Sequence, residues 1–162
     1  MSMFENPRFR WRETYFVLFS RRNRPAGDVV QAALTRLDPD FRIESVRLDE
    51  QGELESLSLL APGAYAALDI CYLEGEDVVE QVRELQQELM HSTLAKEDHQ
   101  RLRRLGECDA RYDVLHFEEV CDEQGEEVDE MFDPGALILV LQELCRLTQG
   151  VAIDPASATF VT

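Results

Sequence analysis

The chain has 162 residues, enough for one folded domain or at most two small ones, and its 44% apolar and 30% charged residues exclude a wholly disordered chain. The formal net charge is −17, from 33 acids against 16 bases, all of them arginine except Lys96. A field of this sign repels nucleic acid and anionic membrane surfaces and favours basic partners or cations.

Taken in chain order, the sequence predicts an arginine-rich leader at residues 1–13 followed by a single domain at residues 14–162. Apolar periodicity and turn residues then place the elements of that domain. They are a strand at 14–19, a helix at 27–37, strands at 41–48, 54–60 and 64–73, a helix at 76–90, a polar helical stretch to 105, a strand at 111–120, a helix at 134–148, and short strands at 151–153 and 158–161.

The last helix has the clearest capping signals at its two ends. Asp133 is a suitable N-cap, Pro134 suits the first helical position, and Gly150 suits the C-cap. Its middle is apolar nearly all round, so we expect a deeply packed core element.

The predicted order is β-α-β-β-β-α(α)-β-α-β-β. It contains the β-α-β-β-α-β series of ferredoxin-like domains. We therefore expect an α+β fold, a mostly antiparallel sheet packed by helices on one side, with a ferredoxin-like-related core followed by the C-terminal helix and short strands.

Ten acids and no Lys or Arg lie between Asp113 and Asp133. Acid-rich loops can bind hard cations, but a calcium loop starting at Asp122 would need glycine where Glu127 stands. We expect a solvated hairpin and no metal site. Its acids are candidates for an interaction surface: Asp122, Glu123, Glu126, Glu127, Asp129 and Glu130.

The leader alternates Arg8, Arg10 and Arg12 with Phe9 and Trp11, so an extended backbone would place the guanidinium groups on one face and the rings on the other. Such a pattern can bind single-stranded nucleic acid, which the net charge disfavours. We expect the leader to dock as an extended segment against the acidic region or a partner subunit, and count its arginines in the same candidate surface.

The pentapeptide Asp-Glu-Gln-Gly-Glu occurs twice, at Asp49–Glu53 and at Asp122–Glu126. An old duplication would explain it. The simpler explanation, which we favour, is that two hairpins use the same turn residues.

Patterns for catalysis and cofactor binding are missing: the sequence has no GxSxG, GxxxxGK[ST], GxGxxG or HExxH motif. His91 and His99 lie two helical turns apart, and Cys108, His116 and Cys121 match no zinc spacing. Tyr65 and Asp69 share a face of a predicted strand, but two residues do not make a site. We therefore name no catalytic, cofactor-binding or metal residue and no cofactor.

The four cysteines, which are Cys71, Cys108, Cys121 and Cys145, form no CxxC pair, and no secretory signal is visible. The longest strongly apolar run, residues 136–141, is far shorter than the ~20 residues of a membrane helix. We expect a cytoplasmic protein with free thiols, of which Cys71 and Cys145 should be buried.

The segment from Asp133 to Phe160 combines an apolar helix with the sequence TQGVAIDPASATF. It resembles the ending of small bacterial proteins and domains of unknown function, where a helix, a glycine, a short strand, Asp-Pro and a final aromatic residue follow one another. The resemblance covers under a fifth of the chain and implies no activity.

These observations favour a non-catalytic bacterial interaction protein, inhibitor- or immunity-like or regulatory, that binds a basic partner as a monomer or homodimer. The alternative is a small ligand-binding regulator or enzyme with a pocket between sheet and helices. A cleft holding convergent polar groups with perturbed ionisation would favour the alternative.

Overall fold

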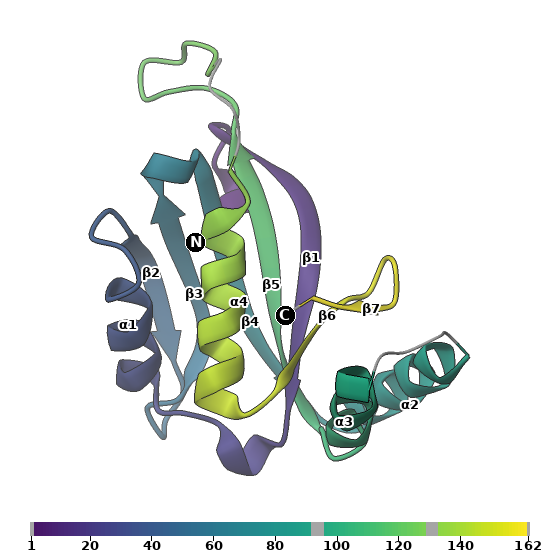
Figure 1. Cartoon of the computed structure of the whole chain (residues 1–162). Coiled ribbons are helices and arrows are strands. Elements are labelled where there is room, and N and C mark those ends of the chain that lie inside the picture. The colour runs from purple at the N-terminus through teal and green to yellow at the C-terminus, as the bar shows by residue number, and fades with distance from the viewer. Residues whose placement is uncertain (1, 92–95, 129–132, 162) are drawn as a thin grey trace.

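The computed structural model describes residues 2–91, 96–128 and 133–161 and shows an α+β fold (Figure 1). Seven strands of these residues form one antiparallel sheet in the order β2-β3-β4-β5-β1-β6-β7. They are β1 (Phe9–Phe19), β2 (Arg42–Leu48), β3 (Leu54–Ala61), β4 (Ala66–Glu74), β5 (Ala110–Glu119), β6 (Val151–Asp154) and β7 (Thr159–Phe160).

Four α-helices among the described residues pack on this sheet: α1 (Gly27–Thr35), α2 (Glu76–Met90), α3 (Lys96–Leu105) and α4 (Gly135–Thr148). The described residues also include three short 3-10 turns: η1 (Met3–Glu5), η2 (Arg21–Asn23) and η3 (Pro62–Ala64). Within the described part of the chain, no helix is long and apolar enough to cross a membrane.

The helices cover both faces of the sheet, so the expectation that they lie on one side is wrong. Val17 and Phe19 pack in the main core with α1 and α4, whereas Phe16 and Leu18 pack with α2 and α3. Successive strand residues point to opposite faces of the sheet, so these two pairs of side chains are buried by different helices. The continuous apolar run at the end of β1 therefore reflects burial from both sides.

The sheet is larger than that of a simple ferredoxin-like fold, and the ferredoxin-like arrangement is not confirmed. β1 lies between β5 and β6, pairing antiparallel with both. The first strand of the chain is thus completed by strands from the C-terminal half.

Two of the boundaries that differ from the sequence prediction have local explanations. β1 begins at Phe9 because the backbone from this residue onward pairs with β5. At the end of α4 the left-handed residue is Gln149, with φ 55°, not Gly150. Gly150 is instead required by packing, since a Cβ there would lie 2.4 Å from the Leu18 carbonyl oxygen.

Candidate functional site

The leader arginines and the acids at the end of β5 neutralise one another. Arg8 Nη2 lies 3.3 Å from Glu119 Oε1, Arg12 Nη1 lies 3.4 Å from Glu118 Oε1, and Arg10 Nε donates to the same Glu118 oxygen at 3.0 Å. The leader therefore docks as an extended strand against the acidic region, as the charge pattern predicts. Each of these three arginines thus has an acidic partner within its own chain.

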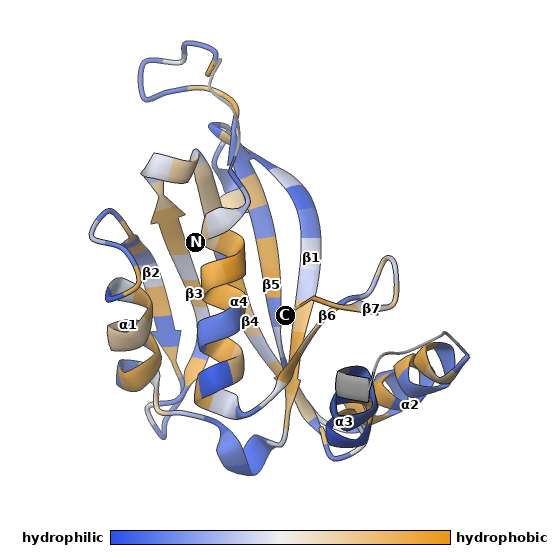
Figure 2. Cartoon of the chain, viewed as in Figure 1, coloured by the Kyte–Doolittle hydropathy of each residue, from blue (hydrophilic) through white to orange (hydrophobic). Residues whose placement is uncertain are grey.

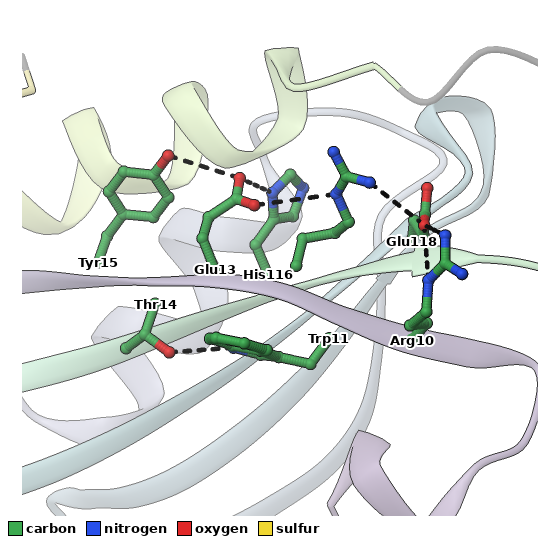
Figure 3. Close-up of polar contacts among 8 residues, drawn as sticks. Arg10, Trp11, Glu13, Thr14, Tyr15, His116 and Glu118 are labelled. Carbon is green, nitrogen blue, oxygen red and sulfur yellow. Dashed lines mark hydrogen bonds and ion pairs between the residues drawn. The ribbon is translucent and has the colours of Figure 1, made fainter. Parts of the chain in front are cut away.

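The two leader aromatics have different environments. Phe9 is buried beside Phe117, whereas Trp11 is about half exposed, at 47%, and donates its Nε1 hydrogen to Thr14 Oγ1 at 3.1 Å. Figure 3 shows Trp11 and Thr14 on the opposite side of β1 from the charged groups. Packing of the leader thus depends on Phe9 more than on Trp11.

A network of one buried and two half-buried side chains, His116, Glu13 and Tyr15, follows the leader on the α4 side of the sheet (Figure 3). The β1–β5 register shifts between Trp11 and Glu13, and this bulge aims Glu13 at His116. Glu13 Oε1 lies 3.2 Å from His116 Nδ1 and accepts a hydrogen bond from the Tyr15 hydroxyl at 3.5 Å. Sequence analysis missed this contact, because it requires the bulge and the pairing of β1 with β5.

Burial of the His116 ring lowers its pKa below the ordinary value, and the Glu13 carboxylate opposes that shift. The pKa of Tyr15 is raised, first by burial and then by Glu13. In the part of the chain that the structure describes, neither His116 nor Glu13 lines any of the cavities described below. The network is therefore poorly placed to receive a substrate.

The acidic segment after β5 forms a hairpin, residues 120–128, that projects beyond the sheet and is mainly hydrophilic (Figures 1 and 2). Val128 N–H donates to Val120 O at 3.0 Å. Glu123, Glu126 and Glu127 are exposed. Asp122 is half-buried, while Asp129 and Glu130 lie outside the described residues.

The first DEQGE segment, between β2 and β3, forms a tight turn. Asp49 N–H donates to Glu53 O at 2.8 Å, and Asp49 Oδ1 accepts the N–H groups of Gln51 and Glu53, each at 2.9 Å. Gly52 has φ 78°, a left-handed value that glycine adopts without strain.

The second DEQGE segment, at the hairpin tip, folds in the same way. Asp122 N–H donates to Glu126 O at 2.8 Å, and Asp122 Oδ1 accepts the N–H groups of Gln124 and Glu126 at 2.9 and 2.8 Å. Gly125 has φ 81°. The repeated pentapeptide is thus a repeated turn.

The first turn holds an arginine of its own chain. Arg24 Nη1 lies 3.2 Å from Asp49 Oδ2 and 3.8 Å from Glu53 Oε1, and Nη2 donates to Leu54 O at 2.7 Å. The guanidinium also stacks on the Tyr72 ring, 3.5 Å from its centroid. Hydrogen bonds from the Glu53 and Gln51 backbones, together with Arg24, lower the pKa of Asp49.

The second turn has no equivalent of Arg24 among the described residues: no cationic nitrogen lies within 4.0 Å of the Asp122, Glu126 or Glu127 carboxylates there. The nearest contact is Arg8 Nη1, 4.0 Å from Glu123 Oε1. The two turns therefore have the same backbone conformation, but among the described residues only the first holds a guanidinium group.

The described residues form several surface cavities, of which three lie near the hairpin, the sheet face or α4. One of about 530 Å³ lies at the base of the hairpin, lined by Arg8, Arg42 and Glu119 among others. A second, of about 430 Å³, lies on the open face of β2–β4. The third is an apolar groove of about 420 Å³ beside the start of α4.

Asp69 lines the second cavity but is committed to the N-terminal segment. Its Oδ1 accepts from Ser58 Oγ at 2.6 Å, and its Oδ2 accepts from Ser2 Oγ at 2.7 Å and Met3 N–H at 3.0 Å. Tyr65 precedes β4 with φ 51°, so the prediction that it shares a strand face with Asp69 is wrong. Asp69 is an anchor for η1.

Residues 2–91, 96–128 and 133–161 contain no group of three His, Cys, Asp or Glu side chains that could hold a metal ion together. Cys71, Cys108, Cys121 and Cys145 form no disulfide with one another. Cys108 is buried, and burial raises its pKa to about 12. Cys71 and Cys145, expected to be buried, are only partly so.

Comparisons with protein-family models, curated proteins and solved structures find no match to this chain. No related protein therefore indicates an activity or a ligand for this chain, and the proposed function is based on its local geometry.

Proposed function

We propose that the chain is a non-catalytic, cytoplasmic interaction module that binds a basic partner, and that the hairpin of residues 120–128 receives an arginine of that partner. An inhibitor- or immunity-like role is one form of this function. The hairpin acids Asp122, Glu123, Glu126 and Glu127 form the surface, and the Arg8 backbone joins the hairpin to β1, since its carbonyl oxygen accepts the Val120 N–H at 2.7 Å.

The observation that carries the proposal is the pair of DEQGE turns. At the first turn, Asp49 and Glu53 hold the guanidinium of Arg24. Asp122 and Glu126 occupy the same positions on a turn with the same hydrogen bonds. A guanidinium matches carboxylate groups held at a fixed spacing, so the second turn suits an arginine supplied from outside.

The overall charge supports the same partner. A net charge of −17 attracts basic proteins over distance and accelerates their association. The projecting position of the hairpin makes it accessible to a protein surface (Figure 1).

The test is binding of a dye-labelled eight-arginine peptide, followed by fluorescence anisotropy at physiological salt. We expect Asp122→Asn with Glu126→Gln to weaken binding about tenfold, roughly the ~1.4 kcal/mol that a tenfold change represents. Asparagine keeps an oxygen that can accept the turn hydrogen bonds, so the variant removes charge and preserves the fold.

The control is Glu80→Gln with Glu84→Gln, which removes two exposed charges from α2. It should change the affinity by less than about twofold, a free-energy change near 0.4 kcal/mol. Equal losses in both variants would mean that the peptide senses only net charge, and would contradict the proposal.

A further inference from the structure

The groove beside α4 has an apolar floor at the hairpin end of the molecule. Phe41, Ala64, Ala136, Ile138 and Leu139 contribute its hydrophobic lining. Ile138 and Leu139 are 42% and 39% exposed, although α4 is otherwise a core helix. Exposed aliphatic side chains that adjoin a groove are typical of binding surfaces.

Three carboxylates stand around this floor. Asp38 Oδ1 accepts the Asp40 N–H at 2.8 Å, and Asp133 Oδ1 accepts the Gly135 N–H at 2.9 Å, which fixes two of the three groups. Asp40 is exposed at the third position. Among the described residues, no Arg or Lys lines the groove.

The groove and the hairpin are neighbours across η3. Gly63 and Ala64 line the groove, while Pro62 and Tyr65 line the cavity at the base of the hairpin. β3 and β5 run in the same direction, because each pairs antiparallel with β4, so η3 and the hairpin leave the sheet at the same end (Figure 1).

We infer that this groove binds an apolar side chain of the basic partner, flanked in that partner by arginine or lysine. The inference rests on the proposed function and names a second contact for the same partner. The floor matches an apolar side chain, and the acidic rim matches the flanking cations by charge complementarity.

Other occupants fit less well. A second copy of this chain would bring another net charge of −17 to an acidic rim, which like-charge repulsion opposes. An anionic lipid surface meets the same repulsion. A basic protein segment with an exposed apolar side chain satisfies both parts of the groove.

The experiment uses labelled ten-residue peptides with alternating Arg–Leu, Arg–Ser or Glu–Leu. We expect wild-type protein to bind Arg–Leu at least about fivefold more tightly than Arg–Ser, near 1 kcal/mol, and to bind Glu–Leu least. Ile138→Ser with Leu139→Ser should remove the preference for Arg–Leu. Asp38→Asn with Asp40→Asn, which leaves the floor intact, should weaken both arginine peptides.

The matched control is Leu48→Ser with Leu73→Ser, since these side chains are 42% and 38% exposed elsewhere on the sheet. It should keep the preference for Arg–Leu, and melting curves should show that both serine variants are folded. An unchanged preference in the Ile138–Leu139 variant would overturn the groove assignment.

The outcomes separate the two proposals. If Arg–Leu and Arg–Ser bind equally and only the Asp122–Glu126 variant weakens them, the groove inference fails and the proposed function stands. Failure of all the arginine peptides to bind would overturn both. Sedimentation that shows a wild-type dimer dissociated by Ile138→Ser with Leu139→Ser would overturn the basic partner in favour of a second copy.

Discussion

At the scale of single residues, His116 makes stability depend on pH. Its ring is fully buried, and burial lowers its pKa below the ordinary value near 6.5. Unfolded chains then bind a proton at a higher pH than folded ones. As pH falls below about 6.5, the unfolded state is therefore favoured until the folded pKa is reached.

We expect the free energy of unfolding to fall between pH 7.5 and 5.5, and His116→Gln to reduce that fall. Urea titrations at both pH values measure it, and the comparison uses the pH dependence because the substitution itself alters a buried site. His91 and His99 are present in both proteins, so the difference between the two pH dependences reports on His116. An identical pH dependence in the variant would contradict the assignment.

The charge pattern was enough to predict that the leader docks, because Arg8, Arg10 and Arg12 pair with acids at the end of β5. The contact between Glu13 and His116 could not be predicted in the same way. It depends on a one-residue bulge after Trp11 and on the pairing of strands about a hundred residues apart. Neither leaves a local pattern in the sequence.

Among the elements, α4 combines a buried face with an exposed apolar face. Leu141 and Leu144 are fully buried, whereas Ile138 is 42% exposed. We expect Leu144→Ala to lower the free energy of unfolding by about 2–5 kcal/mol, the range for truncating a core leucine. Ile138→Ala, the matched control, should cost less than about 1 kcal/mol, since little contact is lost.

Denaturant unfolding curves measure both variants. Equal effects would show that the apolar run is buried all round and would also remove the basis for the groove. The sequence predicted α4 as a core element but not the exposure of Ile138 and Leu139. Apolar periodicity does not distinguish a fully buried helix from one with two apolar residues at the surface.

α2 was predicted with the bounds that the structure has, Glu76–Met90, because a stripe of Val78, Val82, Leu85 and Leu89 marks its buried face. The side of the sheet on which it packs was not predicted. β4 and β5 are neighbours, so the connection between them could turn to either face, and in the structure α2 packs on the face opposite α1 and α4.

For the whole molecule, unpaired acidity should dominate the response to salt. Acids exceed bases by 17, so repulsion acts across the surface, while exposed ion pairs such as Arg10–Glu118 contribute only about 0–1 kcal/mol each. Raising salt from ~10 to ~150 mM shortens the screening length from about 30 to 8 Å. We expect the melting temperature to rise.

Calorimetry at the two salt concentrations measures this effect, and Glu80→Gln with Glu84→Gln should reduce the rise. A melting temperature that falls with salt would mean that ion pairs outweigh repulsion. At this scale the order of the predicted elements indicated the α+β class, and composition indicated an acidic molecule. It did not predict the strand order, which is set by contacts between distant segments.

The central position of β1 has a consequence for synthesis of the chain. As the protein leaves the ribosome, β2, β3 and β4 can pair in order, but β1 must wait for β5, whose last residue is Glu119, and then for β6, which ends at Asp154. β1 therefore stays without a strand partner until β5 has been made. We expect the arginines at its start to limit association of growing chains during that time, because charged residues on an unpaired strand oppose edge-to-edge pairing.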